Sequence, residues 1–76
     1  MPHVVVKLYS GRSEQQKERL ADEITKAVVA SLGNEEDAVS VGIEDVAQER
    51  WLEGVYMPEI LGKPETIYKK PGYNPL

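Results

Sequence analysis

The chain has 76 residues, 13 of them acidic and 9 basic, and a formal net charge of −4. This length predicts a single domain, residues 1–76, and the acidic balance argues against nucleic acid or an anionic membrane as the main partner. The absence of cysteine excludes disulfides and thiolate metal sites, and His3 has no such partners for a structural zinc site. Because so small a domain buries only roughly 60% of its unfolded surface, we expect other copies of the chain to support it.

No segment has the character of a membrane span or an export signal. Apolar runs such as Val4–Val6 are far too short to cross a bilayer. The opening Met-Pro-His-Val has neither a basic n-region nor an apolar h-region. We therefore expect a cytoplasmic protein with no membrane partner.

Two segments have the pattern of β-strands. Residues 3–9 are rich in β-branched and aromatic side chains, and residues 39–44 alternate between apolar and small or polar ones. Residues 14–32, between them, carry apolar side chains at helical spacing, and Ser13 with Gln16 has the pattern of a capping box. This order predicts an α/β (α+β) fold, a β-α-β unit whose two strands are parallel.

The predicted helix has one apolar stripe, so it covers only one face of the two-stranded sheet. The stripe consists of Leu20, Ile24, Ala27, Val28 and Ser31, and Gly33 is expected to end the helix. The other sheet face carries Val5, Tyr9 and Gly42, and an isolated two-stranded sheet is marginal. We expect oligomerisation to complete the sheet.

The last third of the chain predicts an irregular tail with short helices only. Four prolines interrupt it, because a proline removes a helical hydrogen bond and clashes with the preceding turn: Pro58, Pro64, Pro71 and Pro75. Residues 48–53 predict a short helix that carries Trp51, and residues 64–69 a second one that begins at its proline. Residues 69–73 predict a turn, and we expect this tail to pack on a partner subunit.

The N-terminal half combines several motifs. Met1-Pro2 precedes the first strand, Gly11-Arg12-Ser13 follows it, and Gln16-Lys17 lies in the first helical turn. This combination resembles the 4-oxalocrotonate tautomerase family over residues 2 to about 54, and the longer tail is similar to that of the dimeric pseudo-tautomerase branch. The resemblance implies a sheet shared between subunits, a catalytic N-terminal proline, a small carboxylate substrate and no metal or organic cofactor.

Pro2 is the candidate catalytic residue. Inside a chain its nitrogen is an amide, but after removal of Met1 it is a secondary amine that can accept a proton. An α-amino group titrates near ~8, and burial or nearby cations such as Lys7 and Arg12 lower that pKa. The alternative is that Pro2 only begins a strand, where its missing N–H costs nothing.

Arg12 and Ser40 are the candidates for substrate binding. A guanidinium binds carboxylates bidentately, so we expect Arg12, in the turn after the first strand, to hold a carboxylate near Pro2. The alternative is a solvated surface arginine. The resemblance assigns a second arginine to the position of Ser40, whose hydroxyl donates one hydrogen bond without a charge and stabilises an enolate less. We therefore expect low activity on the usual dicarboxylates and favour a monocarboxylate enol such as phenylenolpyruvate.

Three further residues have open roles. Trp51 matches an aromatic wall of the pocket around Pro2, and a core tryptophan is the alternative. Glu53 lies where dehalogenase relatives carry a carboxylate that activates water, although a solvated helix face explains it as well. His3 is expected on the opposite face of the strand from its neighbours, as a ligand donor or a subunit contact.

Three functions follow. We favour a tautomerase, an isomerase that moves a proton by a 1,3-shift on a small 2-hydroxy or 2-oxo carboxylate and works as a homodimer rather than a hexamer. The absence of an arginine at Ser40 motivates the second, a non-catalytic small-molecule binding module on the same fold. The third is a hydratase or dehalogenase that uses Glu53.

Overall fold

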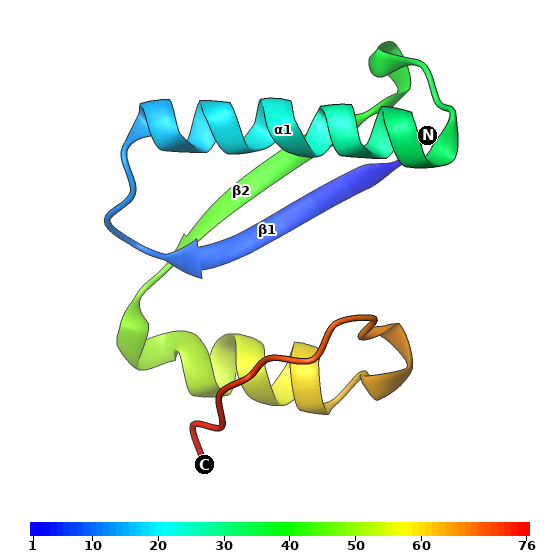
Figure 1. Ribbon diagram of the computed structural model, residues 1–76. Helices are drawn as coiled ribbons and strands as arrows, with labels where there is room; N and C mark the ends of the chain where they lie inside the picture. Colours follow the sequence, from blue (N-terminus) through cyan, green and yellow to red (C-terminus); the bar gives the residue numbers. More distant parts are fainter. The chain divides into compact units, whose positions relative to one another are not determined.

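The computed structural model describes residues 1–76, which form two compact units, Met1–Val46 and Ala47–Leu76. The first unit contains strand β1 (His3–Tyr9), helix α1 (Glu14–Leu32) and strand β2 (Ser40–Val46) (Figure 1). The two strands pair in parallel, with His3 opposite Ser40 and Tyr9 opposite Val46. The predicted β-α-β unit is therefore confirmed.

The second strand lies slightly later in the chain than predicted. It was expected over residues 39–44, whereas β2 runs from Ser40 to Val46. A 3₁₀ turn, Glu36–Ala38, comes before it, and the Val39 N–H donates to the Glu36 carbonyl of that turn at 3.1 Å. Val39 is thus held by the turn, and the ladder with β1 continues to Val46.

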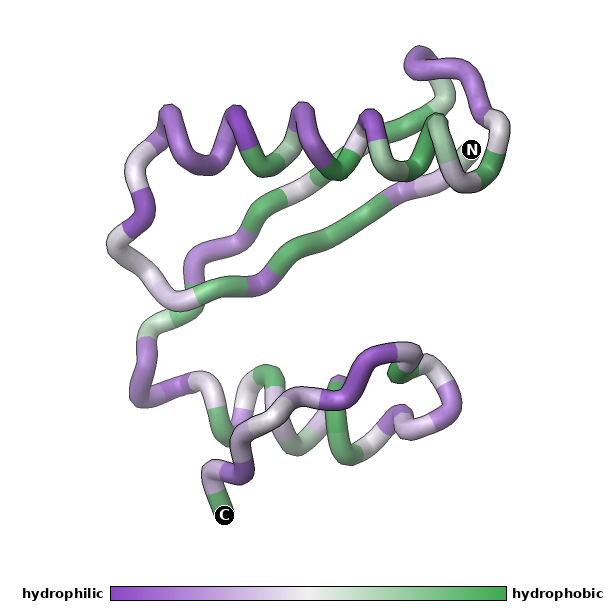
Figure 2. Tube along the Cα trace, viewed as in Figure 1, coloured by the Kyte–Doolittle hydropathy of each residue, from purple (hydrophilic) through white to green (hydrophobic).

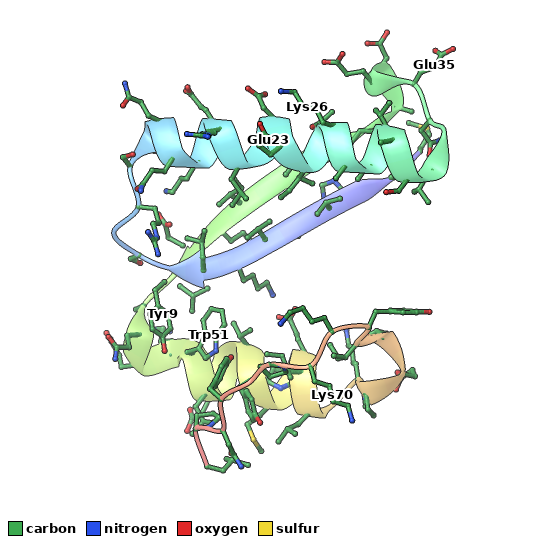
Figure 3. All side chains as sticks on the ribbon, viewed as in Figure 1. Tyr9, Glu23, Lys26, Glu35, Trp51 and Lys70 are labelled. Carbon is green, nitrogen blue, oxygen red and sulfur yellow. The ribbon has the colours of Figure 1, made fainter.

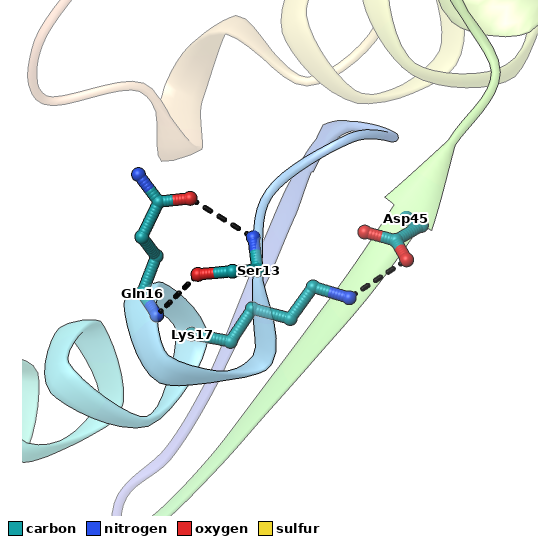
Figure 4. Close-up of polar contacts among 4 residues, drawn as sticks. All are labelled: Ser13, Gln16, Lys17 and Asp45. Carbon is teal, nitrogen blue, oxygen red and sulfur yellow. Dashed lines mark hydrogen bonds and ion pairs between the residues drawn. The ribbon is translucent and has the colours of Figure 1, made fainter.

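Helix α1 begins and ends as predicted. At its start the Gln16 N–H donates to Ser13 Oγ at 3.1 Å, and the Ser13 N–H donates to Gln16 Oε1 at 2.9 Å, which makes a complete capping box (Figure 4). At its end Gly33 takes a φ of +73° and donates its N–H to the Val29 carbonyl. A positive φ favours glycine there, since it has no Cβ to clash.

The apolar stripe of α1 is shifted from the predicted one. Leu20, Ile24 and Val28 are half-buried as expected, but Ala27 and Ser31 are exposed. Their places are taken by Ala21, Thr25 and Val29. Figure 2 shows the hydrophilic side of α1 turned away from the two strands. The register places Val4, Val6 and Leu8 on one sheet face with Val41 and Ile43.

No side chain of the first unit is fully buried. On the second sheet face Val5 and Tyr9 keep 46% and 47% of their surface exposed. A β-α-β unit that leaves apolar side chains half-covered gains little hydrophobic stabilisation from its own core.

The second unit contains a longer helix than the sequence predicts. After a 3₁₀ turn, Gln48–Arg50, a π-helix runs over Leu52–Leu61 and includes Pro58. The expectation that prolines forbid a long element here was wrong. In an α-helix the ring of Pro58 would clash with the carbonyl four residues earlier. The wider π turn changes that spacing. The last hydrogen bond of the helix has the π pattern, since the Gly62 N–H donates to the Met57 carbonyl, five residues earlier, at 2.9 Å.

The buried side chains of the protein lie on this π-helix. Val55 and Tyr56 are each 6% exposed. The tail returns to the helix: the Tyr73 ring lies 5.8 Å from the Tyr56 ring, and Trp51 Nε1 donates to the Tyr73 hydroxyl at 2.9 Å. At Tyr73 the tail therefore packs on the helix of its own unit, and its predicted contact with a partner subunit stays a prediction. Between helix and tail, Pro64 opens a 3₁₀ turn of three residues, Pro64–Thr66, shorter than the helix predicted for 64–69.

No helix of the structure has both the length and the apolar character needed to cross a membrane.

Candidate functional site

The N-terminal end of the sheet brings Pro2 beside Ser40. Pro2 directly precedes β1, and its carbonyl accepts a hydrogen bond of 3.1 Å from the Ser40 N–H. Pro2 is half-buried, whereas Met1 is fully exposed. Removal of Met1 therefore breaks no packing, and it would leave the Pro2 amine next to the first residue of β2.

His3 and Ser40 interact directly at this end. They are register partners in the parallel ladder, and His3 Nδ1 lies 2.6 Å from Ser40 Oγ in a hydrogen bond. The sequence pattern placed each side chain on a face of its own strand but did not predict that the two would be in contact. The sequence did not reveal the strand register, which pairs His3 with Ser40 rather than with a residue next to Ser40.

Arg12 lies at the other end of β1. The turn that carries it is made by Gly11, whose φ of +120° disfavours any residue with a Cβ. The seven-residue strand between the two ends is about 20 Å long, and Figure 1 shows the N-terminus and the β1–α1 turn at its opposite ends. The sequence led us to expect Arg12 near Pro2, but within one protomer the two residues lie at opposite ends of β1.

Arg12 lines a surface hollow at its end of the sheet. The hollow has a volume of about 330 Å³ and is lined by Leu8, Arg12, Gln16, Lys17 and Leu20. The Lys17 ammonium donates to Asp45 Oδ2 at 2.7 Å (Figure 4). This hydrogen bond, together with the negative charges of Asp45 and Glu14, raises the pKa of Lys17 above its usual value. The hollow thus contains the Arg12 guanidinium and a Lys17 ammonium whose charge is paired with Asp45; carboxylate binding at Arg12 stays a prediction.

Trp51 and Glu53 belong to the second unit. Trp51 is half-buried and bonded to Tyr73, so its polar nitrogen has a partner within the unit. Glu53 is exposed in the first turn of the π-helix. The unit has an apolar hollow of about 360 Å³, whose lining includes Tyr56, Tyr73 and Lys70; Figure 3 labels Trp51 and Lys70. The roles of Trp51 and Glu53 toward Pro2 stay predictions.

A third hollow lies between α1 and the 3₁₀ turn Glu36–Ala38. It has a volume of about 490 Å³ and is lined by Asp22, Thr25, Lys26, Val29, Ala30 and Glu36. Lys26 also forms an exposed ion pair of 3.6 Å with Glu23 (Figure 3). Pro2 lines none of the three hollows described, and no three His, Asp or Glu side chains gather to hold a metal ion.

The sequence matches the family model described as "Tautomerase enzyme" over residues 2–60. The chain belongs to the tautomerase family. A "Probable tautomerase" of Xylella fastidiosa (strain 9a5c) is 42% identical over 76 residues, which cover all of this chain and 93% of that protein. "Tautomerase PptA" of Cronobacter sakazakii (strain ATCC BAA-894) is 39% identical over 74 residues, 96% of this chain and 97% of the relative.

Solved structures agree with the sequence relatives. TomN, described as a 4-oxalocrotonate tautomerase homologue in the tomaymycin biosynthetic pathway, superposes with a TM-score of 0.64 at 38% identity over 66% of this chain and 77% of its own. The resemblance to 4-oxalocrotonate tautomerases is therefore confirmed, with full-length relatives of the PptA type. Membership in this family gives the protein the activity class of a tautomerase, an isomerase.

Proposed function

We propose that this tautomerase transfers a proton in a 1,3-shift on a small 2-hydroxy or 2-oxo monocarboxylate, with the Pro2 amine as the base. The observation that carries the proposal is the family match, which begins at residue 2 and spans β1, α1 and β2. The exposure of Met1 supports it, because the residue is accessible for removal. A free prolyl amine then takes a proton from the enol oxygen or the α-carbon and returns it to the other position.

The substrate carboxylate binds to Arg12 of a second copy of the chain. The length of β1 separates Arg12 from Pro2 within one protomer, whereas a two-fold interface brings opposite ends of two sheets together. The exposed apolar residues Val5 and Tyr9 on the open sheet face supply a surface for that interface. We propose a homodimer, as the resemblance to the dimeric pseudo-tautomerase branch implies, since the matches to the relatives extend through the tail.

The substrate carries one carboxylate. Arg12 is the one arginine of the proposed site, and the group beside Pro2 on β2 is the neutral Ser40 hydroxyl. A hydroxyl hydrogen-bonds an enol or ketone oxygen but gives no charge to hold a second carboxylate. Activity on dicarboxylates is therefore low, and an aromatic monocarboxylate such as phenylenolpyruvate is the better substrate, with Trp51 proposed as an apolar wall.

The decisive experiment follows ketonisation of phenylenolpyruvate by the wild type and by Pro2→Ala. We expect the variant to lose at least about a hundredfold in kcat/KM, the contribution of a positioned general base. Intact mass measurement of the same samples verifies that Met1 is absent from both. Equal rates in the two demethionylated proteins would refute the proposal and leave the non-catalytic binding module as the better description.

A second activity is tested with Glu53, which is exposed at the start of the π-helix. If the protein is instead a hydratase or dehalogenase, it turns over a chloroacrylate and Glu53→Gln stops the turnover. We expect no turnover of chloroacrylate and a phenylenolpyruvate rate in Glu53→Gln equal to that of the wild type. The variant Glu49→Gln, a neighbouring exposed carboxylate, is the matched control.

A further inference from the structure

The hydrogen bond between His3 and Ser40 lies directly beside Pro2. Ser40 Oγ is 2.6 Å from His3 Nδ1, and the Ser40 backbone N–H is bonded to the Pro2 carbonyl at 3.1 Å. Both residues are exposed, so the bond contributes little to the stability of the fold. A contact of this kind, next to the proposed base, is better placed to orient a group than to hold the fold.

The direction of this hydrogen bond decides what Ser40 can do. A serine hydroxyl has one proton to donate and two lone pairs that accept. If the hydroxyl donates to His3, its single proton is used and it offers a substrate only lone pairs. If the Nδ1–H of His3 donates to Oγ, the hydroxyl proton is left to point at a substrate oxygen. An enolate oxygen accepts hydrogen bonds, so only the second arrangement stabilises it.

We propose that His3 is a positioning residue, whose Nδ1–H holds Ser40 Oγ so that the Ser40 hydroxyl donates to the reacting oxygen of the substrate beside Pro2. The inference rests on the proposed function and names the donor for its enolate. His3 holds the hydroxyl and fixes its rotamer, so that its proton points at the substrate oxygen. The pair comes from two strands and is assembled by the parallel register alone.

The test is a double-mutant cycle with phenylenolpyruvate. We expect His3→Ala and Ser40→Ala each to lower kcat by about 100-fold, the lower end of the effect of losing one donor to an oxyanion, with KM changed less than roughly threefold. Because His3 acts through Ser40, the double variant should be no slower than Ser40→Ala alone. His3→Asn, whose side-chain amide offers a donor near the position of Nδ1, should recover most of the rate.

Three results would overturn the inference. These are additive losses in the double variant, a His3→Asn as slow as His3→Ala, and a His3→Ala with the wild-type rate. Glu18→Gln is the control, because it changes an exposed polar side chain on α1 rather than on the sheet; its kcat should stay unchanged. Thermal unfolding of each variant separates a folding defect from a catalytic one.

Pro2→Ala, measured in parallel, separates the two proposals. If Pro2→Ala keeps the wild-type rate, the proposed function fails and the inference fails with it. If Pro2→Ala is inactive while His3→Ala is fully active, only the role of His3 is wrong.

Discussion

The two ends of the β1–β2 sheet differ in their chemistry. The N-terminal end presents Pro2, His3 and Ser40, which are joined by hydrogen bonds. The other end presents Arg12 and the ion pair between Lys17 and Asp45. The groups that would accept a proton and bind an anion are thus about 20 Å apart along one strand. On the proposed function, one chain carries both halves of the site but brings them together only with a second copy, so that activity depends on assembly.

Mixing two impaired variants is the strongest test of this separation. Pro2→Ala removes the base from one end, and Arg12→Ala removes the guanidinium from the other. If each site takes its base and its arginine from different protomers, heterodimers contain one intact site, and random mixing restores about a quarter of the wild-type activity. The measurement is the phenylenolpyruvate rate after the two proteins are unfolded together and refolded. A mixture that stays as inactive as its components contradicts a shared site.

Arg12→Ala alone measures what the charged end contributes. Loss of a charge-assisted hydrogen bond to a carboxylate costs about 1.5–3 kcal/mol, which corresponds to a roughly 10- to 100-fold loss in kcat/KM. We expect Arg12→Lys to keep part of the rate, because it retains the charge but not the bidentate geometry. Arg19→Ala removes an exposed arginine of α1 and is the control. An equal loss in Arg19→Ala would mean that general charge, rather than Arg12, attracts the substrate.

Ser13→Ala tests how firmly the turn that carries Arg12 is held. The capping box with Gln16 begins α1 directly after Arg12. Removing an N-cap costs about 1 kcal/mol, which lowers the Tm of a chain of this length by roughly 4–8 °C. Ser31→Ala, an exposed serine in the last turn of the same helix, should change the Tm little. Equal Tm values for Ser13→Ala and the wild type would show that the cap does not stabilise α1.

The smallest expected effect concerns the ion pair between Lys17 and Asp45. The pair raises the pKa of Lys17 above its usual value of 10.5, so its contribution to stability is present at neutral pH and is lost as the pH rises through the raised pKa. Asp45→Asn should therefore lower the Tm slightly near neutral pH and have no effect above that pKa. Glu23→Gln, which breaks the exposed pair with Lys26 at 3.6 Å, should have almost none at either pH. A Tm difference for Asp45→Asn that grows toward high pH would contradict this assignment.

Local patterns were enough to predict the first unit. The capping box at Ser13, the glycine after α1 and the alternation in β1 act over a few residues, so the sequence shows them directly. The register was not visible, because it depends on how far α1 and its connections carry β2 along β1. The His3–Ser40 contact follows from that register, so the sequence did not predict it. The distance between Pro2 and Arg12 follows from the length of β1, and the sequence analysis wrongly placed the two together within one chain.

The second unit was predicted less well because tertiary packing there overrides a local signal. Pro58 is an ordinary reason to end a helix. The burial of Val55 and Tyr56, and the return of Tyr73 onto that helix, offset the cost of the lost hydrogen bond. Local sequence patterns do not show that these contacts outweigh the effect of Pro58, since Tyr73 is remote in sequence from the helix that it covers.

The exposed Met1 has a practical consequence for work on this protein. On the proposed mechanism the reacting nitrogen exists only after an aminopeptidase has acted, so any tag fused before Pro2 yields a well-folded but inactive product. We expect the opposite terminus to accept a tag, because Leu76 is 71% exposed. Activity in a C-terminally tagged preparation, together with its loss in an N-terminally tagged one, would show that Met1 must be removed for activity, as a mass spectrum shows the removal itself.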